Sequence, residues 1–254
     1  GGVDTSRLHA RASEVLHYLS SVTRSLQEKN DALGGAAPFS PESPDLRLAT
    51  SIAEGADQIV TDAAVDAGYN LNLILPFPRA SYAQDFEGAA LEKFQRTFDH
   101  NAVQSCTELD LGDMPDGRND GYLAAGHLML AHSDVLVAIW DQKAADGLGG
   151  SAEIVNDARQ RGIITVLITL EGELKLWKVP DTAVDLLEDG EWQALNLSSE
   201  ATPVSLALAE QIEEHLALPE QVYSAHDTPS FVAGLRRFKG EKFHPDCWAF
   251  FFFF

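Results

Sequence analysis

Two nearly unbroken apolar segments constrain the fold of this chain more than any other feature. Residues 134–140 read DVLVAIW and residues 163–169 read IITVLIT. A strand that is apolar on both faces is typical of a parallel sheet covered by helices on both sides. Residues 151–161 between them have the pattern of a helix, so the three segments predict a strand–helix–strand unit with a right-handed crossover.

The same alternation runs through the preceding part of the chain. We predict helices at residues 6–29, 51–68, 79–100 and 122–132, and strands at residues 45–51, 69–77 and 102–111. After residue 170 the pattern weakens, and a short hairpin or irregular pieces precede a helix at 203–217. The expected fold is therefore α/β: a Rossmann-like, mostly parallel sheet flanked by helices on both faces.

The domain organisation follows from where this pattern stops. We assign residues 1–170 to one ligand-binding domain, and residues 171–254 to an extension of it or to an appended element.

The six apolar residues 249–254 are far fewer than the ~20 that span a bilayer. Three interpretations stay open: a membrane segment that continues beyond Phe254, a buried tail, or an artefact of how the chain was made. The basic run RRFKGEK before the tail resembles a cytoplasmic flank.

The composition excludes some partners. A net charge of −21, from 39 acidic and 18 basic residues, argues against direct nucleic-acid binding and against charge-driven binding to anionic membranes. It leaves room for a small anion held by backbone N–H groups.

Cys106 and Cys247 provide neither a disulfide framework nor a metal site, and we expect both to be small buried side chains in a reducing compartment. No signal peptide is present in the first twenty residues, so we expect a cytoplasmic protein, tethered only if a membrane segment follows.

Two segments carry the candidate site, because ligands of open parallel sheets bind beyond the carboxyl ends of the strands. In residues 50–57, TSIAEGAD, the glycine can take a positive φ or allow close backbone approach, and the aspartate can cap the local turn. In residues 141–153, glycines precede a helix start, whose N–H groups and partial positive charge attract phosphate. The candidate ligand-binding residues are Ser51, Gly55, Asp57, Asp141, Lys143, Gly149, Gly150, Ser151 and Glu153.

Each of these features also has a purely structural interpretation. A glycine pair before a helix is usually a turn, Asp141 and Lys143 suit a solvated loop, and Glu153 stabilises a helix dipole wherever it stands. No His/Cys/Asp cluster has metal-ligand spacing, and neither a nucleophile elbow nor a phosphate-loop lysine motif is present. We therefore predict no metal and no required cofactor.

Four ordered segments within residues 6–170 resemble the SLOG superfamily, which groups DNA-processing protein A with the Lonely Guy phosphoribohydrolases. They resemble most a bacterial branch of it, and they read IAEGAD (52–57), LPFPRASYAQDF (75–86), SDVLVAIWD (133–141) and GGSAE (149–153). Family members also place a strand before their first helix, and residues 1–8 show none.

The resemblance implies binding of a nucleotide-derived ligand at the glycine loop. Several family members are thought to be sensor domains of bacterial conflict and defence systems that recognise ADP-ribose- or NAD-type signals, and relatives commonly form homo-oligomers. Gly149, Gly150 and Ser151 would then hold phosphate, and Asp141 would accept hydrogen bonds from ribose hydroxyls. Two alternatives stay open: a nucleotide-processing hydrolase of the phosphoribohydrolase type, with Glu153 as its acid or base, and a structural domain with a vestigial pocket.

Overall fold

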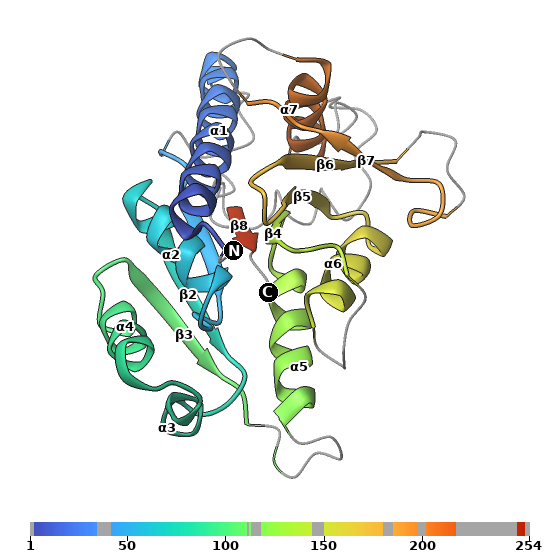
Figure 1. The fold of residues 1–254 in the computed structure, drawn as a ribbon. Coiled ribbons are helices and arrows are strands. Elements are labelled where there is room, and N and C mark those ends of the chain that lie inside the picture. Colours follow the sequence, from blue (N-terminus) through green and yellow to red (C-terminus); the bar gives the residue numbers. More distant parts are fainter. Residues whose placement is uncertain are drawn as a thin grey trace, which may run out of the picture.

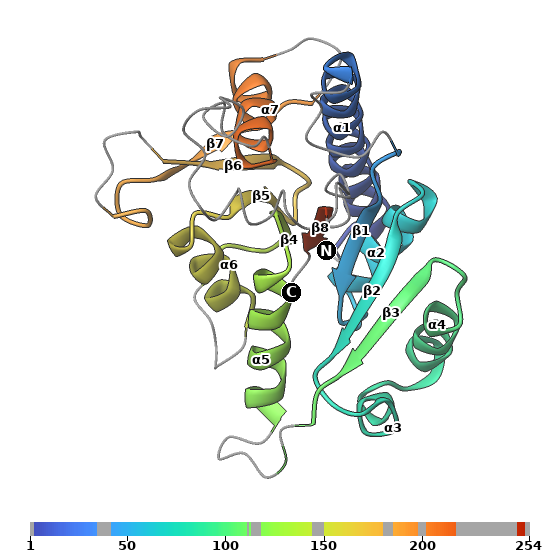
Figure 2. The same ribbon diagram turned by 180° about the vertical axis from the view of Figure 1, so that it is seen from behind.

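The chain forms one eight-stranded sheet with helices packed against it (Figures 1 and 2). The computed structural model describes residues 3–34, 42–110, 112, 118–143, 150–179, 185–197, 202–216 and 248–251. The strand order is β3-β2-β1-β8-β4-β5-β6-β7. Neighbouring strands are parallel from β3 to β5, whereas β6 and β7 join the edge antiparallel. The predicted α/β class is confirmed.

The elements have the following bounds. The strands are β1 (Leu46–Thr50), β2 (Asn70–Leu75), β3 (Val103–Glu108), β4 (Val135–Ile139), β5 (Ile164–Ile168), β6 (Leu174–Lys178), β7 (Glu191–Ala194) and β8 (Trp248–Phe251). The helices are α1 (Thr5–Ala32), α2 (Ala56–Asp66), α3 (Arg79–Tyr82), α4 (Gly88–Phe98), α5 (Arg118–Ala131), α6 (Ser151–Gln160) and α7 (Pro203–Leu216), with a 3₁₀ turn η2 (Ala83–Asp85) between α3 and α4.

Both faces of the sheet are buried in its centre. In β4, Val135 and Val137 pack into a core formed with α1, α2, α4 and α7, whereas Leu136 and Ala138 pack against α5 and α6 on the other face. All five residues of β4 are buried, and so are all five of β5. This two-sided burial explains why each strand is a continuous apolar run rather than an alternating one.

Several predicted boundaries were wrong for local reasons. The helix predicted at 79–100 is broken, because Phe86 is extended (φ −115°, ψ 143°) and places its ring against Phe94, with ring centroids 4.7 Å apart. The helix predicted from residue 51 begins at Ala56, because residues 51–55 form a loop. Helix α5 begins at Arg118, four residues earlier than predicted.

The cysteine prediction was also wrong where the structure tests it. Cys106 is exposed, because β3 is the edge strand and five of its six residues are exposed. Cys247 lies outside the described residues. Cys106 is therefore not the small buried side chain that we expected.

The part of the chain after residue 170 adds to the same sheet and core. Strands β6 and β7 extend the edge next to β5, and Leu208 and Ile212 of α7 join the core that contains α1. The backbone of β8 lies between β1 and β4, with Phe250 in register with both Leu48 and Val135. Residues 252–254 of the apolar tail lie outside the described residues. None of the helices that the structure describes has the length and apolar character needed to cross a membrane.

Candidate functional site

The two loops singled out from the sequence both contain a strained residue. Ile52, two residues after β1, has φ +51°, and Gln142, three residues after β4, has φ +61°. These are the non-glycine residues with positive φ within the described ranges. A β-branched residue in this region is a rare outlier, and such strain persists where the surrounding structure enforces it. The strain therefore falls at the carboxyl ends of the parallel strands.

The first loop is held in shape by the buried carboxyl of Asp57. Its Oδ2 accepts hydrogen bonds from the Ala53 amide and the Thr50 hydroxyl, both at 3.3 Å. The Thr50 hydroxyl oxygen in turn accepts from the amide of Ile52 at 3.0 Å. Gly55 has φ +100°, so the expectation that this loop needs glycine freedom is confirmed. These contacts fix the left-handed conformation of Ile52.

Burial sets the charge of Asp57 as well. The side chain is 3% exposed, and desolvation raises its pKa to about 7, although the hydrogen bonds from Ala53 and Thr50 act in the opposite direction. Ser51 is buried beside it and donates to the carbonyl of Ile74 at 2.9 Å. The side chains of Ser51 and Asp57 are thus bonded to groups of the protein itself. A ligand at this loop would meet the backbone that these side chains support.

The second loop begins with a tight turn at Asp141. Its Oδ1 accepts from the amide of Lys143 at 3.0 Å, and its Oδ2 lies 2.8 Å from the Lys143 ammonium. The hydrogen bond with the Lys143 side chain is the largest cause of the lowered pKa of the Asp141 carboxyl. The turn around Gln142 therefore presents an ionised carboxylate and an ammonium together at the end of β4.

Helix α6 starts where the sequence predicted. Ser151 is its first residue, and Gly150 precedes it in an extended conformation and has no side chain with which to cap the helix. The carbonyl of Gly150 accepts from the amides of Glu153 and Ile154 at 3.0 and 3.3 Å. The first turn is therefore a regular helix start that carries about half a positive charge. Gly149 lies outside the described residues.

A cluster that the sequence reasoning missed lies at the same end of the sheet. The Asp85 carboxylate accepts from the Tyr122 hydroxyl at 2.5 Å and pairs with the Arg118 guanidinium. Arg118 lies over the Phe77 ring, and Tyr82 is fully buried below. Tyr82 and Asp85 belong to the segment at 75–86, which the sequence marked only through its resemblance to a family. No signal connected that segment to Arg118, which lay within a predicted loop.

This cluster depends on the absence of a side chain at Gly121. A Cβ there would lie 2.3 Å from Cε1 of Phe77 and 3.0 Å from the carbonyl oxygen of Pro76. Gly121→Ala is therefore expected to displace Phe77 and to lower the free energy of unfolding by about 1–3 kcal/mol, in spite of alanine's higher helix propensity. Urea unfolding measures the change.

A double-mutant cycle separates the clash from other effects of the alanine. In a Phe77→Leu background the smaller side chain leaves room for the Cβ. Gly121→Ala should therefore lower the free energy of unfolding less in that background than in the parent chain. An equal cost in both backgrounds would show that the aromatic ring does not set the requirement for glycine.

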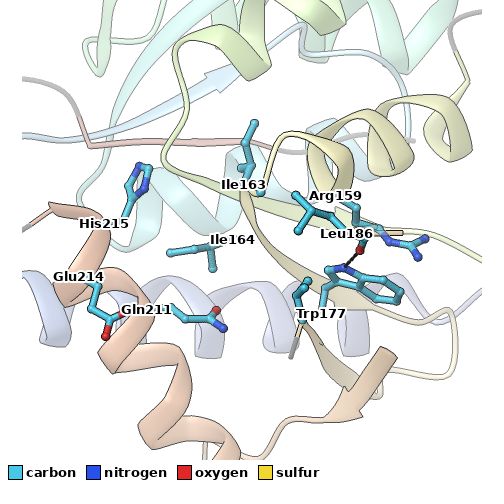
Figure 3. Close-up of a pocket in the computed structure, with 10 residues that line it drawn as sticks. Arg159, Ile163, Ile164, Trp177, Leu186, Gln211, Glu214 and His215 are labelled. Atoms are coloured by element: carbon cyan, nitrogen blue, oxygen red, sulfur yellow. Dashed lines mark hydrogen bonds between the residues drawn. The ribbon is translucent and has the colours of Figure 1, made fainter. Parts of the chain in front are cut away.

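A pocket of about 380 Å³ lies at the opposite end of the sheet (Figure 3). Its floor contains Ile163 and Ile164 at the start of β5, and α7 places Gln211, Glu214 and His215 around it. Among the predicted ligand-binding residues that the structure describes, none lines this pocket. It is therefore not the site predicted from the sequence.

Neither metal ligation nor a known relative identifies the site. Within the described ranges, no group of three or more His, Cys, Asp and Glu side chains is arranged to hold a metal ion. Comparisons with protein-family models, curated proteins and solved structures found no match.

Proposed function

We propose that the loops at the carboxyl ends of β1 and β4 bind a nucleotide-derived anion of the ADP-ribose or NAD type. The single observation that carries the proposal is the strain at Ile52 and Gln142, one in each of the two loops chosen from the sequence. Strained backbone clusters at ligand-binding sites, where a bound group makes use of the unusual conformation. The carboxyl end of such a sheet is also where ligands bind.

The roles of the residues follow from their chemistry. The amides of Gly150 and Ser151 hold phosphate at the start of α6, where Glu153 lies in the first turn. Asp141 accepts hydrogen bonds from the ribose hydroxyls, and the Lys143 ammonium beside it keeps that carboxylate ionised.

The first loop forms the facing wall of the site. Asp57 fixes the loop, and Gly55 lets its backbone approach the ligand closely. The second loop lies on the far side of the ligand, so one molecule contacts both.

The proposed biological role is that of a cytoplasmic sensor in a bacterial conflict or defence protein with a Rossmann-like SLOG fold. Ligand binding transmits a signal if it favours one arrangement of a homo-oligomer over another. This role requires binding without turnover, which separates it from a nucleotide hydrolase.

Binding and turnover are measured together. The protein is incubated with ADP-ribose, NAD or AMP, the melting temperature is recorded, and the products are separated by chromatography. A higher melting temperature with unchanged ligand is the expected result. Release of a base or phosphate, lost in Glu153→Ala, would support the hydrolase instead. No shift with any of the three nucleotides would contradict the proposal.

A charge placed at the start of α6 tests the phosphate site. Ser151→Asp is expected to abolish the rise in melting temperature caused by ADP-ribose, because a carboxylate at the helix start repels phosphate. Asn156→Asp is the matched control, since it adds the same charge in the middle of the same helix and should keep the shift. A full shift in Ser151→Asp would remove this loop from the site.

A further inference from the structure

The guanidinium of Arg118 is exposed to solvent and yet held in a defined position. Arg118 is the first residue of α5, and 47% of its side chain is exposed. One face of the guanidinium lies over the Phe77 ring, with Cζ 4.2 Å from the centroid, while Nη2 pairs with Oδ2 of Asp85. The hydrogen bond that Arg118 donates to Asp85 raises the pKa of Arg118. A guanidinium oriented by a carboxylate and an aromatic face is prepared for bidentate recognition of another oxyanion.

Asp85 also fixes the orientation of Tyr122 one helical turn further on. The Tyr122 hydroxyl donates to the same Oδ2 at 2.5 Å, so one carboxylate oxygen serves both donors. Burial, followed by this hydrogen bond, raises the pKa of Tyr122 to about 12, so the phenol stays a neutral donor. Because a guanidinium has five N–H donors, its pairing with Asp85 leaves others for an incoming group.

A buried hydroxyl beneath the cluster is an independent indication of a ligand. Tyr82 is 1% exposed, and within the described ranges its hydroxyl has no hydrogen-bond partner. Burial is the main cause of its raised pKa, and the charges of Asp57 and Asp85 add to the effect. The Tyr82 ring packs against Phe77 and Tyr122 of the cluster, with ring centroids 6.3 and 6.2 Å apart. A buried O–H without an acceptor is costly, so the Tyr82 hydroxyl calls for an explanation, and a group bound at this cluster is one.

We propose that Arg118 binds a phosphate group of the ligand, with Asp85 and Tyr122 as positioning residues. The inference rests on the proposed function and extends it: the ligand carries a phosphate at the start of α5 as well as one at the start of α6. Both helix starts lie at the carboxyl end of the parallel strands, toward the bottom of Figure 1. The exposed guanidinium is a fixed cation, and the N–H donors that it does not use for Asp85 suit an anionic group.

Isothermal titration calorimetry with two probes tests the assignment. ADP-ribose and inorganic pyrophosphate are titrated into the parent chain and into Arg118→Gln, Arg118→Lys and Asp85→Asn. Arg118→Gln should weaken binding of both probes about tenfold or more, because a charge-assisted pair is lost. Arg118→Lys should recover part of the affinity, since it restores the charge but not the planar fork. Asp85→Asn should weaken binding less than Arg118→Gln does.

The controls separate this inference from the proposed function. Arg96→Gln removes the same charge from an exposed site on α4 and should bind both probes like the parent chain. Adenosine, which has no phosphate, should not distinguish Arg118→Gln from the parent chain. Circular dichroism confirms that each variant is folded.

The outcomes are distinct for the two proposals. Equal affinities of Arg118→Gln and the parent chain for pyrophosphate overturn the assignment of Arg118, and so does a parent chain that does not bind pyrophosphate. Binding of pyrophosphate that depends on Arg118, without binding of any nucleotide, supports the Arg118 site while contradicting the proposed nucleotide ligand.

Discussion

Asp57→Asn is expected to remove a large pH dependence of stability. Burial raises the pKa of Asp57 from 3.8 to about 7, so the folded chain holds a proton that the unfolded chain releases. The contribution of this carboxyl to the free energy of unfolding is fully present below pH 3.8 and is lost as the pH rises to about 7. The loss is about 1.4 kcal/mol per pH unit, or roughly 4 kcal/mol in total. Asparagine cannot titrate, and its side-chain oxygen can still accept the hydrogen bonds from Ala53 and Thr50.

Urea unfolding of both chains at several pH values measures the effect. Between about pH 5 and about pH 7.5, the free energy of unfolding of the variant should rise by roughly 2–3 kcal/mol relative to that of the parent chain. Asp66→Asn is the matched control, since it removes the same charge from a side chain of α2 that is 72% exposed. Parallel curves for Asp57→Asn and the parent chain would mean that the carboxyl is ionised in the fold throughout this range.

Phe94→Ala is expected to lower the free energy of unfolding by about 3–5 kcal/mol. Phe94 is 1% exposed, and its ring contacts Tyr82, Phe86 and Phe98 at centroid distances of 5.7, 4.7 and 6.3 Å. Removing the ring leaves a cavity where α4 packs against the segment that carries Tyr82 and Asp85. The truncation should therefore weaken the Arg118 cluster as well as the core.

Phe94→Leu provides the comparison, because it keeps most of the volume and should cost about 1 kcal/mol. Urea unfolding followed by far-ultraviolet circular dichroism gives both values. If alanine and leucine were equally costly, cavity formation would not be the cause, and the loss of the aromatic ring contacts would account for the cost.

The fold class was predictable because its signal is local. The apolar runs that became β4 and β5 are buried on both faces, and helix periodicity between strands indicates parallel pairing. The start of α6 at Ser151 was predictable for a similar reason, since glycines before a helical pattern mark a helix start.

The candidate site was predictable only in part. The sequence indicated the loops after β1 and β4, and both contain a strained residue in the structure. It did not indicate that Ser51 and Asp57 turn inward, because burial of a polar side chain depends on partners elsewhere, such as the carbonyl of Ile74. It also did not indicate Arg118, whose partner Asp85 is 33 residues away in the chain.

By itself, the sequence determined the elements whose residues repeat with a regular period, and thereby the layered α/β class. Only the tertiary structure decided that residues 248–251 pair with β1 and β4, and that Asp85, Arg118 and Tyr122 meet at one end of the sheet. The physical reason is the range of the interactions. Helix and strand periodicity reflects neighbours a few residues apart, whereas these contacts depend on where the whole chain places distant segments.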